Sequence, residues 1–143
     1  MRINNTEPAD NLTDVLTKIY EFTVERNNVL MANLENASKP GYMPLDMPVE
    51  EFASIMDVAV SEHCRSKRLV FCDSRNVKFK EGTFCDARPA VDAEAVRLLT
   101  KDKNEFLELQ LRKLSENTLN QKIACELLKQ KQGVGTILST MEL

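Results

Sequence analysis

His63 and Cys64 are adjacent in this sequence and are the closest it comes to a catalytic pair. A thiol nucleophile needs a base within hydrogen-bond reach and usually a third group that orients the base. Neighbouring residues on a helix point about 100° apart, so this pair is poorly placed for catalysis. We therefore interpret His63 as a helix-surface or half-buried residue. The acidic residues lie in Glu/Lys-rich helical patterns typical of solvated faces, and we predict that the protein is not an enzyme.

The sequence contains four cysteines, Cys64, Cys72, Cys85 and Cys125. A metal site could be drawn from His63 with the first three of them, but their gaps do not match the spacing of two to four residues found in structural zinc sites. We predict no metal and no cofactor, and interpret the thiols as small buried hydrophobic groups. A small metal-binding regulator is kept as a minor alternative.

Length and composition favour one soluble, helix-rich domain. The chain has 143 residues, is 43% hydrophobic and 29% charged, and contains only four Gly and five Pro. The net charge of -3 gives no electrostatic reason to expect nucleic acid. No stretch approaches the roughly 18 apolar residues of a membrane span, and the polar N-terminus lacks the apolar core of a secretory signal.

The first predicted element is a long N-terminal helix over residues 11–39, after a disordered lead over residues 1–10. Asn11 can serve as its N-cap, and Tyr20 with Val24 forms a second apolar stripe. Pro40 and Gly41 end the helix, since proline disfavours helix at the preceding residue and glycine readily supplies a turn. Its main apolar face recurs at helical spacing, at Leu12, Leu16, Ile19, Phe22 and Leu30.

Residues 40–90 form an irregular middle region in this interpretation. A short helix is predicted from Pro48, which suits a first helical position, to about Arg65. Its apolar side is expected to contain Phe52, Ile55, Met56, Ala59 and Val60. The β-branched and aromatic residues that follow predict a small hairpin or extended loop turning around residues 73–76.

The last predicted element is a C-terminal helix over residues 91–143, which Asp92 can cap. The segment of residues 101–104 carries no apolar residue and is a candidate break in this helix. The apolar stripe changes phase between Leu114 and Leu119, so the pattern is not a strict heptad repeat. Its later part is formed by Leu119, Ile123, Leu127, Val134 and Leu138.

These elements predict a mainly α fold in which the long N- and C-terminal helices pack together as an antiparallel pair. A short helix and a small irregular or β-hairpin region lie between them, within one domain over residues 11–143. Neither long helix can bury its apolar face alone, and packing the two together still leaves apolar stripes outside. Such surplus apolar surface indicates partner helices.

The segment ANLENASKPGY, residues 32–42, resembles the N-terminal signature of bacterial flagellar rod, hook and axial proteins. It departs from that signature at Glu35 and Lys39, where Ala and Thr are usual. Residues 104–119 are similar to a C-terminal helix of the same proteins, with an alternative register at Val91 and Asp92. With these two matches and its short length, the chain resembles the proximal rod proteins of the FlgB family. The residues that carry the assembly motif are Ala32, Asn33, Leu34, Asn36, Pro40, Gly41 and Tyr42.

The resemblance implies a structural subunit of the flagellar basal body rod. Such a subunit is exported without a cleaved signal peptide and assembles in the periplasm through its terminal helices. The implied partners are copies of itself, other flagellar rod proteins, the adaptor between the rod and the membrane-embedded MS ring, and the flagellar export apparatus. No nucleic acid and no small-molecule substrate are expected. The alternative from the residues alone is a cytoplasmic helical adaptor or chaperone.

The junction after the N-terminal helix has a physical role in this interpretation. We hypothesise that Asn33 and Asn36 bond backbone groups of a neighbouring segment, while Gly41 takes a conformation that other residues avoid. Tyr42 offers an apolar ring with a polar tip. The junction would then fix how the chain leaves the helix and how it meets the next subunit.

Overall fold

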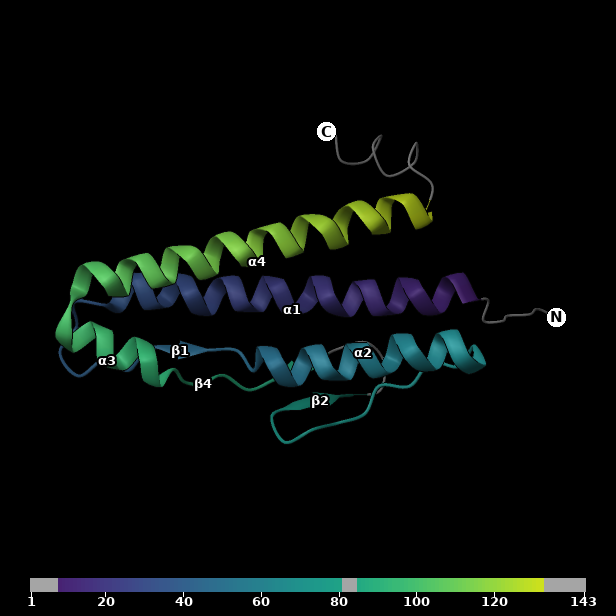
Figure 1. The fold of residues 1–143 in the computed structure, drawn as a ribbon, viewed down its shortest axis with the longest axis horizontal. Helices are drawn as coiled ribbons and strands as arrows, with labels where there is room; N and C mark the ends of the chain where they lie inside the picture. The colour runs from purple at the N-terminus through teal and green to yellow at the C-terminus, as the bar shows by residue number, and fades with distance from the viewer. Residues whose placement is uncertain (1–7, 81–84, 133–143) are drawn as a thin grey trace.

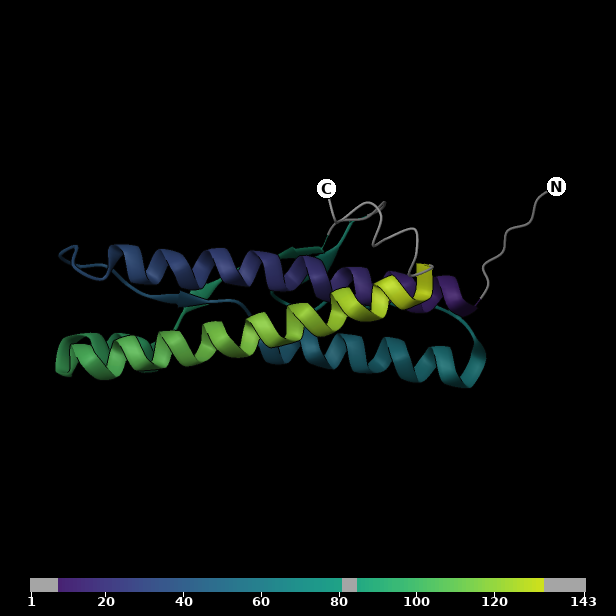
Figure 2. The same ribbon diagram turned by 90° about the horizontal axis from the view of Figure 1, so that it is seen from above.

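The computed structural model describes residues 8–80 and 85–132, and this part of the chain is mainly helical. The long helices α1 and α4 pack against each other in antiparallel directions, as Figure 1 shows. Viewed from above, α4 crosses α1 at a shallow angle (Figure 2). The predicted fold class is therefore confirmed. The helices are α1 (Pro8–Asn36), α2 (Val49–Ser66), α3 (Ala93–Lys101) and α4 (Lys103–Gln132), and the strands are β1 (Leu45–Asp46), β2 (Val77–Phe79), β3 (Cys85–Ala87) and β4 (Ala90–Val91).

Helix α1 begins at Pro8, three residues before the predicted start. Proline is well suited to a first helical position, since its missing N–H would have no partner there. The predicted N-cap was therefore wrong. Asn11 lies inside the helix, and its Nδ2 donates to the backbone oxygen of Lys67 at 3.1 Å. The predicted lead over residues 1–10 is helical from residue 8 onward, and residues 1–7 lie outside the described part.

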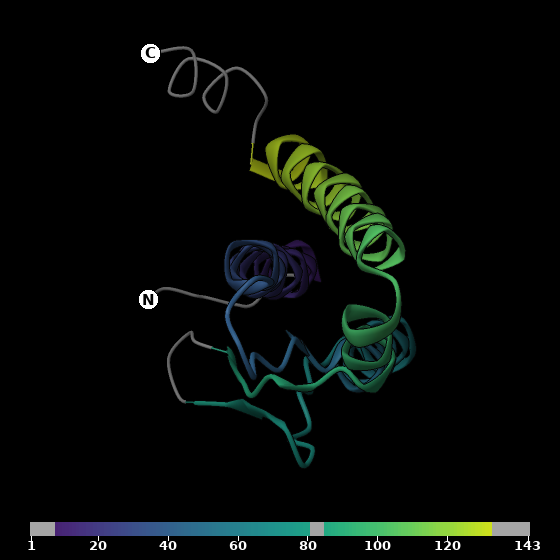
Figure 3. The ribbon, with the colours of Figure 1, turned by 90° about the vertical axis from the view of Figure 1, so that its left-hand side faces the viewer.

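The C-terminal half is two helices rather than the single helix predicted for residues 91–143. Helix α3 ends at Lys101, Asp102 is extended, and α4 begins at Lys103. The Asp102 carboxylate accepts from the backbone N–H groups of Asn104 and Glu105 at 3.1 and 3.3 Å, so it caps α4. The candidate break in residues 101–104 is thus where the chain reverses, with α3 and α4 on different sides of α1 (Figure 3). Residues 133–143, with Val134 and Leu138, lie outside the described part.

Two short antiparallel pairs complete the fold, and the sequence located one of them incorrectly. Strand β2 pairs with β3, with Val77 opposite Ala87 and Phe79 opposite Cys85. The predicted turn at residues 73–76 instead precedes β2, because Glu51 on α2 holds that segment through its carboxylate. Strand β1 pairs with β4, placing Leu45 opposite Val91. That pairing joins the segment after α1 to the segment before α3.

The main core lies between α1, α2 and the β2–β3 hairpin. The Phe22 and Phe52 rings stack with centroids 4.0 Å apart. A second buried cluster, with Phe106 and Leu98, joins α3 to α4. Four of the five residues predicted for the apolar side of α2 are buried, whereas Val60 is 38% exposed. Fully burying such side chains stabilises a fold by about 1.5–3 kcal/mol each.

None of the helices in residues 8–80 and 85–132 combines the length and the apolar character that crossing a bilayer requires.

Candidate functional site

Asn33 is fully buried near the end of α1 and connects three segments of the chain. Its Nδ2 donates to the backbone oxygen of Leu45 at 2.8 Å and to Oε1 of Gln110 on α4 at 2.9 Å. Its Oδ1 accepts from the Tyr42 hydroxyl at 2.9 Å and from the backbone N–H of Leu45 at 3.0 Å. An amide side chain has two donors and two acceptor positions. The full capacity of Asn33 is therefore used inside this chain, in what we call the Asn33 joint (Asn33, Tyr42, Leu45 and Gln110).

The Asn33 joint confirms part of the hypothesis for this junction. Asn33 bonds the backbone of the segment that follows α1, and burial raises the pKa of the Tyr42 phenol beside it. Gly41 has a φ of +76°, in the left-handed region that suits glycine. Asn36 behaves differently, because its Nδ2 donates to the backbone oxygen of Ala32 in its own helix. Contact of this junction with another subunit stays a prediction.

The other motif residues surround the joint without entering its hydrogen bonds. Ala32 and Leu34 are partly buried on α1, and Pro40 is exposed in the turn. The turn is closed by backbone bonds from Lys39 N–H to Asn36 O and from Tyr42 N–H to Lys39 O, at 3.0 and 3.2 Å. The motif therefore forms one compact reversal that sets the path from α1 into β1.

A chain of ion pairs runs beside the Asn33 joint. Arg26 on α1 donates from Nε and Nη2 to both oxygens of Asp46 on β1, at 2.9 and 3.0 Å. Lys113 on α4 donates to Asp46 at 2.8 Å and to Asp92 at 2.7 Å. Asp92 is also the N-cap of α3, accepting from the backbone N–H of Ala95. These four side chains, the ion-pair network, link α1, β1, α3 and α4.

The ion-pair network shifts the pKa values of its members. Burial alone would raise the pKa of Asp46, but the hydrogen bonds and charges of Arg26 and Lys113 outweigh it, so this pKa is lowered. Burial alone would lower the pKa of Lys113, but the hydrogen bonds and charges of Asp46 and Asp92 raise it. Each group is thus held in its charged form over a wider pH range than in an unfolded chain.

Sequence reasoning missed the roles of Gln110 and Lys113. Gln110 contacts Asn33 on α1, and Lys113 contacts Asp46 and Asp92. The Nδ2 of Asn117 donates to the backbone oxygen of Thr23 on α1 at 2.7 Å. Positions 110, 113 and 117 follow one another at spacings of three and four, so they share one helical face. A polar row at that spacing was a readable signal. The face of α4 against α1 is therefore more polar than the predicted apolar pairing.

Five exposed leucine and isoleucine residues of α4 lie on two flanks of this polar row, whereas Leu109 is buried and Leu114 and Leu128 are partly buried. With 100° per residue, Leu107 and Leu111 fall on one flank, and Leu119, Ile123 and Leu127 fall on the other. All five are exposed, from 36% for Leu107 to 58% for Leu119. The change of phase between Leu114 and Leu119 in the sequence thus corresponds to a move of the apolar residues from one flank of α4 to the other. Of the predicted apolar face of α1, Phe22 and Leu30 are buried and Leu12, Leu16 and Ile19 are partly buried.

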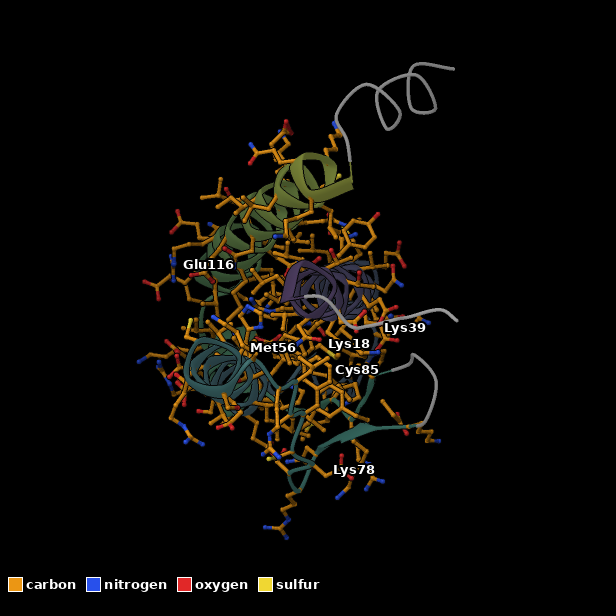
Figure 4. All side chains as sticks on the ribbon, turned by 90° about the vertical axis from the view of Figure 1, so that its right-hand side faces the viewer. Lys18, Lys39, Met56, Lys78, Cys85 and Glu116 are labelled. Carbon is orange, nitrogen blue, oxygen red and sulfur yellow. The ribbon has the colours of Figure 1, made fainter. Side chains whose placement is uncertain are left out.

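An open apolar groove lies along α1 between α2 and α4. Helices α2 and α4 each pack on α1 but have few contacts with each other. Figure 4 shows Met56 of α2 and Glu116 of α4 on the same side of α1. The groove has a volume of about 490 Å³, and its polar lining is restricted to Thr23, Arg26, Asp57, Asn117 and Asn120. Its apolar lining is formed by Leu16, Ile19, Phe22, Val49, Phe52, Ala53, Met56, Val60, Ile123, Ala124 and Leu127.

The residues with nucleophilic or metal-binding side chains do not come together. The interpretation of the thiols as buried groups was wrong for Cys64 and Cys72, which are exposed, whereas Cys85 is buried and Cys125 is partly buried. Burial raises the pKa of the Cys85 thiol to about 11, and the nearby Glu25 carboxylate adds to this shift. The interpretation of His63 as a helix-surface or half-buried residue was wrong, because it is buried on the core side of α2. Its Nδ1 has no hydrogen-bond partner among the described residues. No group of three His, Cys, Asp or Glu side chains in residues 8–80 and 85–132 could hold a metal ion.

Comparison with known proteins identifies no relative of this chain. No protein-family model, curated protein or solved structure matches the chain. Its candidate site therefore has to be interpreted from its own residues.

Proposed function

We propose that this chain is a non-catalytic structural subunit that assembles with other helical proteins through α1 and α4. The observation that carries the proposal is the exposed leucine and isoleucine residues on both flanks of α4. Scattered exposed apolar residues are common, but helical rows of them beside an apolar groove are typical of protein interaction surfaces. Large aliphatic side chains gain most when a partner covers them.

The more specific proposal is a rod subunit of the bacterial flagellar basal body. The support is the resemblance of residues 32–42 to the signature of flagellar axial proteins, together with the compact reversal that these residues make. Because Asn33 ties α1, β1 and α4 together, the junction can hold both long helices in a fixed arrangement. A subunit that repeats along a rod needs such a fixed arrangement, since errors in one copy are passed to the next.

The proposal includes the partners and the location that the resemblance implies. The partners would be copies of this chain, other rod proteins, the adaptor to the MS ring, and the flagellar export apparatus during secretion. The location would be the periplasmic part of the basal body, reached without a cleaved signal.

A cytoplasmic adaptor or chaperone is the second candidate. It is favoured by one observation, the exposed free thiols of Cys64 and Cys72. Exposed thiols persist unpaired in reducing compartments and tend to oxidise outside them.

The test uses a tagged copy of the full chain in its source bacterium, with the chromosomal copy deleted. We expect the tagged chain in purified basal bodies and loss of motility without it. The paired variant Leu107→Gln, Leu111→Gln should fold normally but be depleted from basal bodies, since its apolar flank no longer favours a neighbour. Lys122→Gln on the same helix is the matched control. Absence of the wild-type chain from basal bodies would reject the rod proposal, and a soluble cytoplasmic complex would favour the adaptor.

A further inference from the structure

The end of α2, the segment of residues 67–76 and the β2–β3 hairpin form a basic surface on an otherwise acidic chain. Residues 62–88 contain seven Lys or Arg and four Asp or Glu, a net charge of +3. The rest of the chain contains twelve and eighteen, a net charge of -6. All seven basic residues are exposed, and we call the surface they form the basic face: Arg65, Lys67, Arg68, Arg75, Lys78, Lys80 and Arg88.

The pairing of β2 with β3 places three of these residues on one face of the hairpin. Side chains alternate between the two faces of a strand, so Lys78 and Lys80 share a face. Lys78 is opposite Asp86 in the register, and Arg88 follows Asp86 by two positions. The alternate residues of both strands are buried or partly buried. Figure 4 accordingly shows Lys78 beyond Cys85 as seen from α1.

Acidic neighbours neutralise only part of this charge. Arg65 and Arg68 share the carboxylate of Glu62, at 2.7 and 3.6 Å, and Lys80 lies 3.7 Å from Asp86. The other four basic side chains form no ion pair with a described residue. Figures 1 and 3 place the segment from the end of α2 to β2 on the side of the molecule away from α4. The basic face is therefore separate from the exposed leucines of α4.

The basic face lacks the apolar centre of a protein interface. Such interfaces have a core of buried large side chains within a polar rim. None of the exposed large apolar residues of the described chain lies in residues 61–80 or 85–90. The face thus offers charge and little else, which suits a partner that is recognised by its charge alone.

The basic face also lacks the features that bind single-stranded nucleic acid or a small anion. Open aromatic rings on which bases stack are typical of single-strand binding. Here Phe71 and Phe79 stack on each other, with centroids 5.0 Å apart, and pack against the core. None of the seven basic residues lines the apolar groove or the pocket beside the ion-pair network. The charges lie on a broad exposed surface rather than in a cleft.

We propose that the basic face docks on the surface of an anionic lipid bilayer, with its Lys and Arg side chains among the headgroup phosphates. This inference does not rest on the proposed function. Basic residues near an anionic bilayer each add to the attraction without inserting into it. The acidic α4 side lies beyond α1, and packed helices are about 8–10 Å apart. Because the screening length is about 8 Å at physiological salt, repulsion from that side is weak.

The test is sedimentation of the purified full chain with lipid vesicles. Vesicles of phosphatidylglycerol and phosphatidylcholine in equal parts should bind the chain, whereas vesicles of phosphatidylcholine alone should not. Raising the salt from about 0.05 M to about 0.5 M should release it, because exposed charges are then screened. The paired variant Lys78→Gln, Arg88→Gln should bind the mixed vesicles roughly 30-fold more weakly.

The matched control is Arg112→Gln, Lys122→Gln, which removes the same charge from exposed positions of α4. It should bind as wild type does, and both paired variants should keep the wild-type thermal midpoint. Equal weakening by the two pairs, or no binding of wild type to the mixed vesicles at low salt, would overturn the proposal. Tighter binding to a DNA duplex or to polyglutamate at the same charge concentration would overturn it in favour of nucleic acid or an acidic protein. These assays use the isolated chain, so their failure is separate from failure of basal-body incorporation.

Discussion

At the scale of single residues, Asn33 is a fully buried polar residue whose whole hydrogen-bonding capacity is used within the chain. Four hydrogen bonds converge on its buried amide, and they tie α1 to residues 42–45 and to α4. Buried polar groups that lose a partner retain their desolvation cost without compensation. Asn33 therefore contributes to the specificity of the chain path at least as much as to its stability.

The first prediction concerns this residue. Asn33→Ala should lower the free energy of unfolding by roughly 3 kcal/mol, since buried groups of Leu45 and Gln110 lose their partner. Tyr42→Phe removes one of the four bonds and should cost about 1 kcal/mol. Urea denaturation monitored by circular dichroism measures both.

Asn36→Ala is the matched control, because its Nδ2 donates to the backbone of its own helix rather than to β1 or α4. It should change the free energy of unfolding by less than about 0.5 kcal/mol. Equal losses for the two asparagines would contradict the assigned role of Asn33.

At the scale of elements, the ion-pair network fixes how the strands and α3 sit on the long helices. Asp46 is on β1, Asp92 begins α3, and Lys113 of α4 bonds both carboxylates. Breaking a buried ion pair on one side leaves an unpaired buried charge, which is strongly destabilising. These short elements thus depend on long-range contacts rather than on their own propensities.

The second prediction is the pH dependence of stability. Because the pKa of Asp46 is lowered in the folded state, the unfolded chain takes up this proton first as pH falls. The contribution of Asp46 is present above its unfolded pKa of about 3.8 and is lost as pH falls through the folded value. The pKa of Lys113 is raised, so its contribution is present below its unfolded pKa and is lost as pH rises through the folded value.

Asp46→Asn should therefore cost roughly 3 kcal/mol at neutral pH and flatten both the acid and the alkaline decline. The measurement is the thermal midpoint from pH 2 to 11. Glu108→Gln, at an exposed position on α4, is the control and should leave both declines unchanged. A variant with Asp46→Asn whose pH profile parallels that of wild type would refute the role of the ion-pair network.

At the scale of the whole molecule, the two long helices share a polar seam flanked by apolar surface. Gln110 and Asn117 lie buried against α1, while leucines of the same helix face outward. The buried polar residues and the exposed apolar residues of α4 thus lie on different faces of the helix. This division predicts that changes on the two faces have separable effects.

The third prediction tests that separation. Leu30→Ala, at a fully buried position of α1, should lower the free energy of unfolding by about 2–5 kcal/mol, because it removes contacts and leaves a cavity. Leu111→Ala, at a residue that is 57% exposed, should change it by less than about 0.5 kcal/mol. Chemical denaturation measures both. A large loss for Leu111→Ala in the monomer would mean that its flank is covered within the chain.

The sequence alone determined the helical class, the antiparallel pair of long helices, the helix near residues 48–65 and the special character of the junction at residues 32–42. Those features follow from local periodicity, capping and turn residues, which act over a few positions. The sequence analysis misplaced the start of α1, because Pro8 already suits a first helical position. It also misplaced the hairpin, because the Glu51 carboxylate bonds Ser74 and Asn76 and holds that segment ahead of β2.

Only the tertiary structure decided which polar residues meet. Asn33 and Gln110 are 77 positions apart, and nothing in either local pattern specifies the other. Likewise, α4 turns its polar row inward because Asn33, Asp46 and the backbone oxygen of Thr23 provide hydrogen-bond partners there. Apolar periodicity carries no information about those partners. Local sequence therefore set the elements of this protein, and cooperative contacts between distant residues set which of their faces are buried.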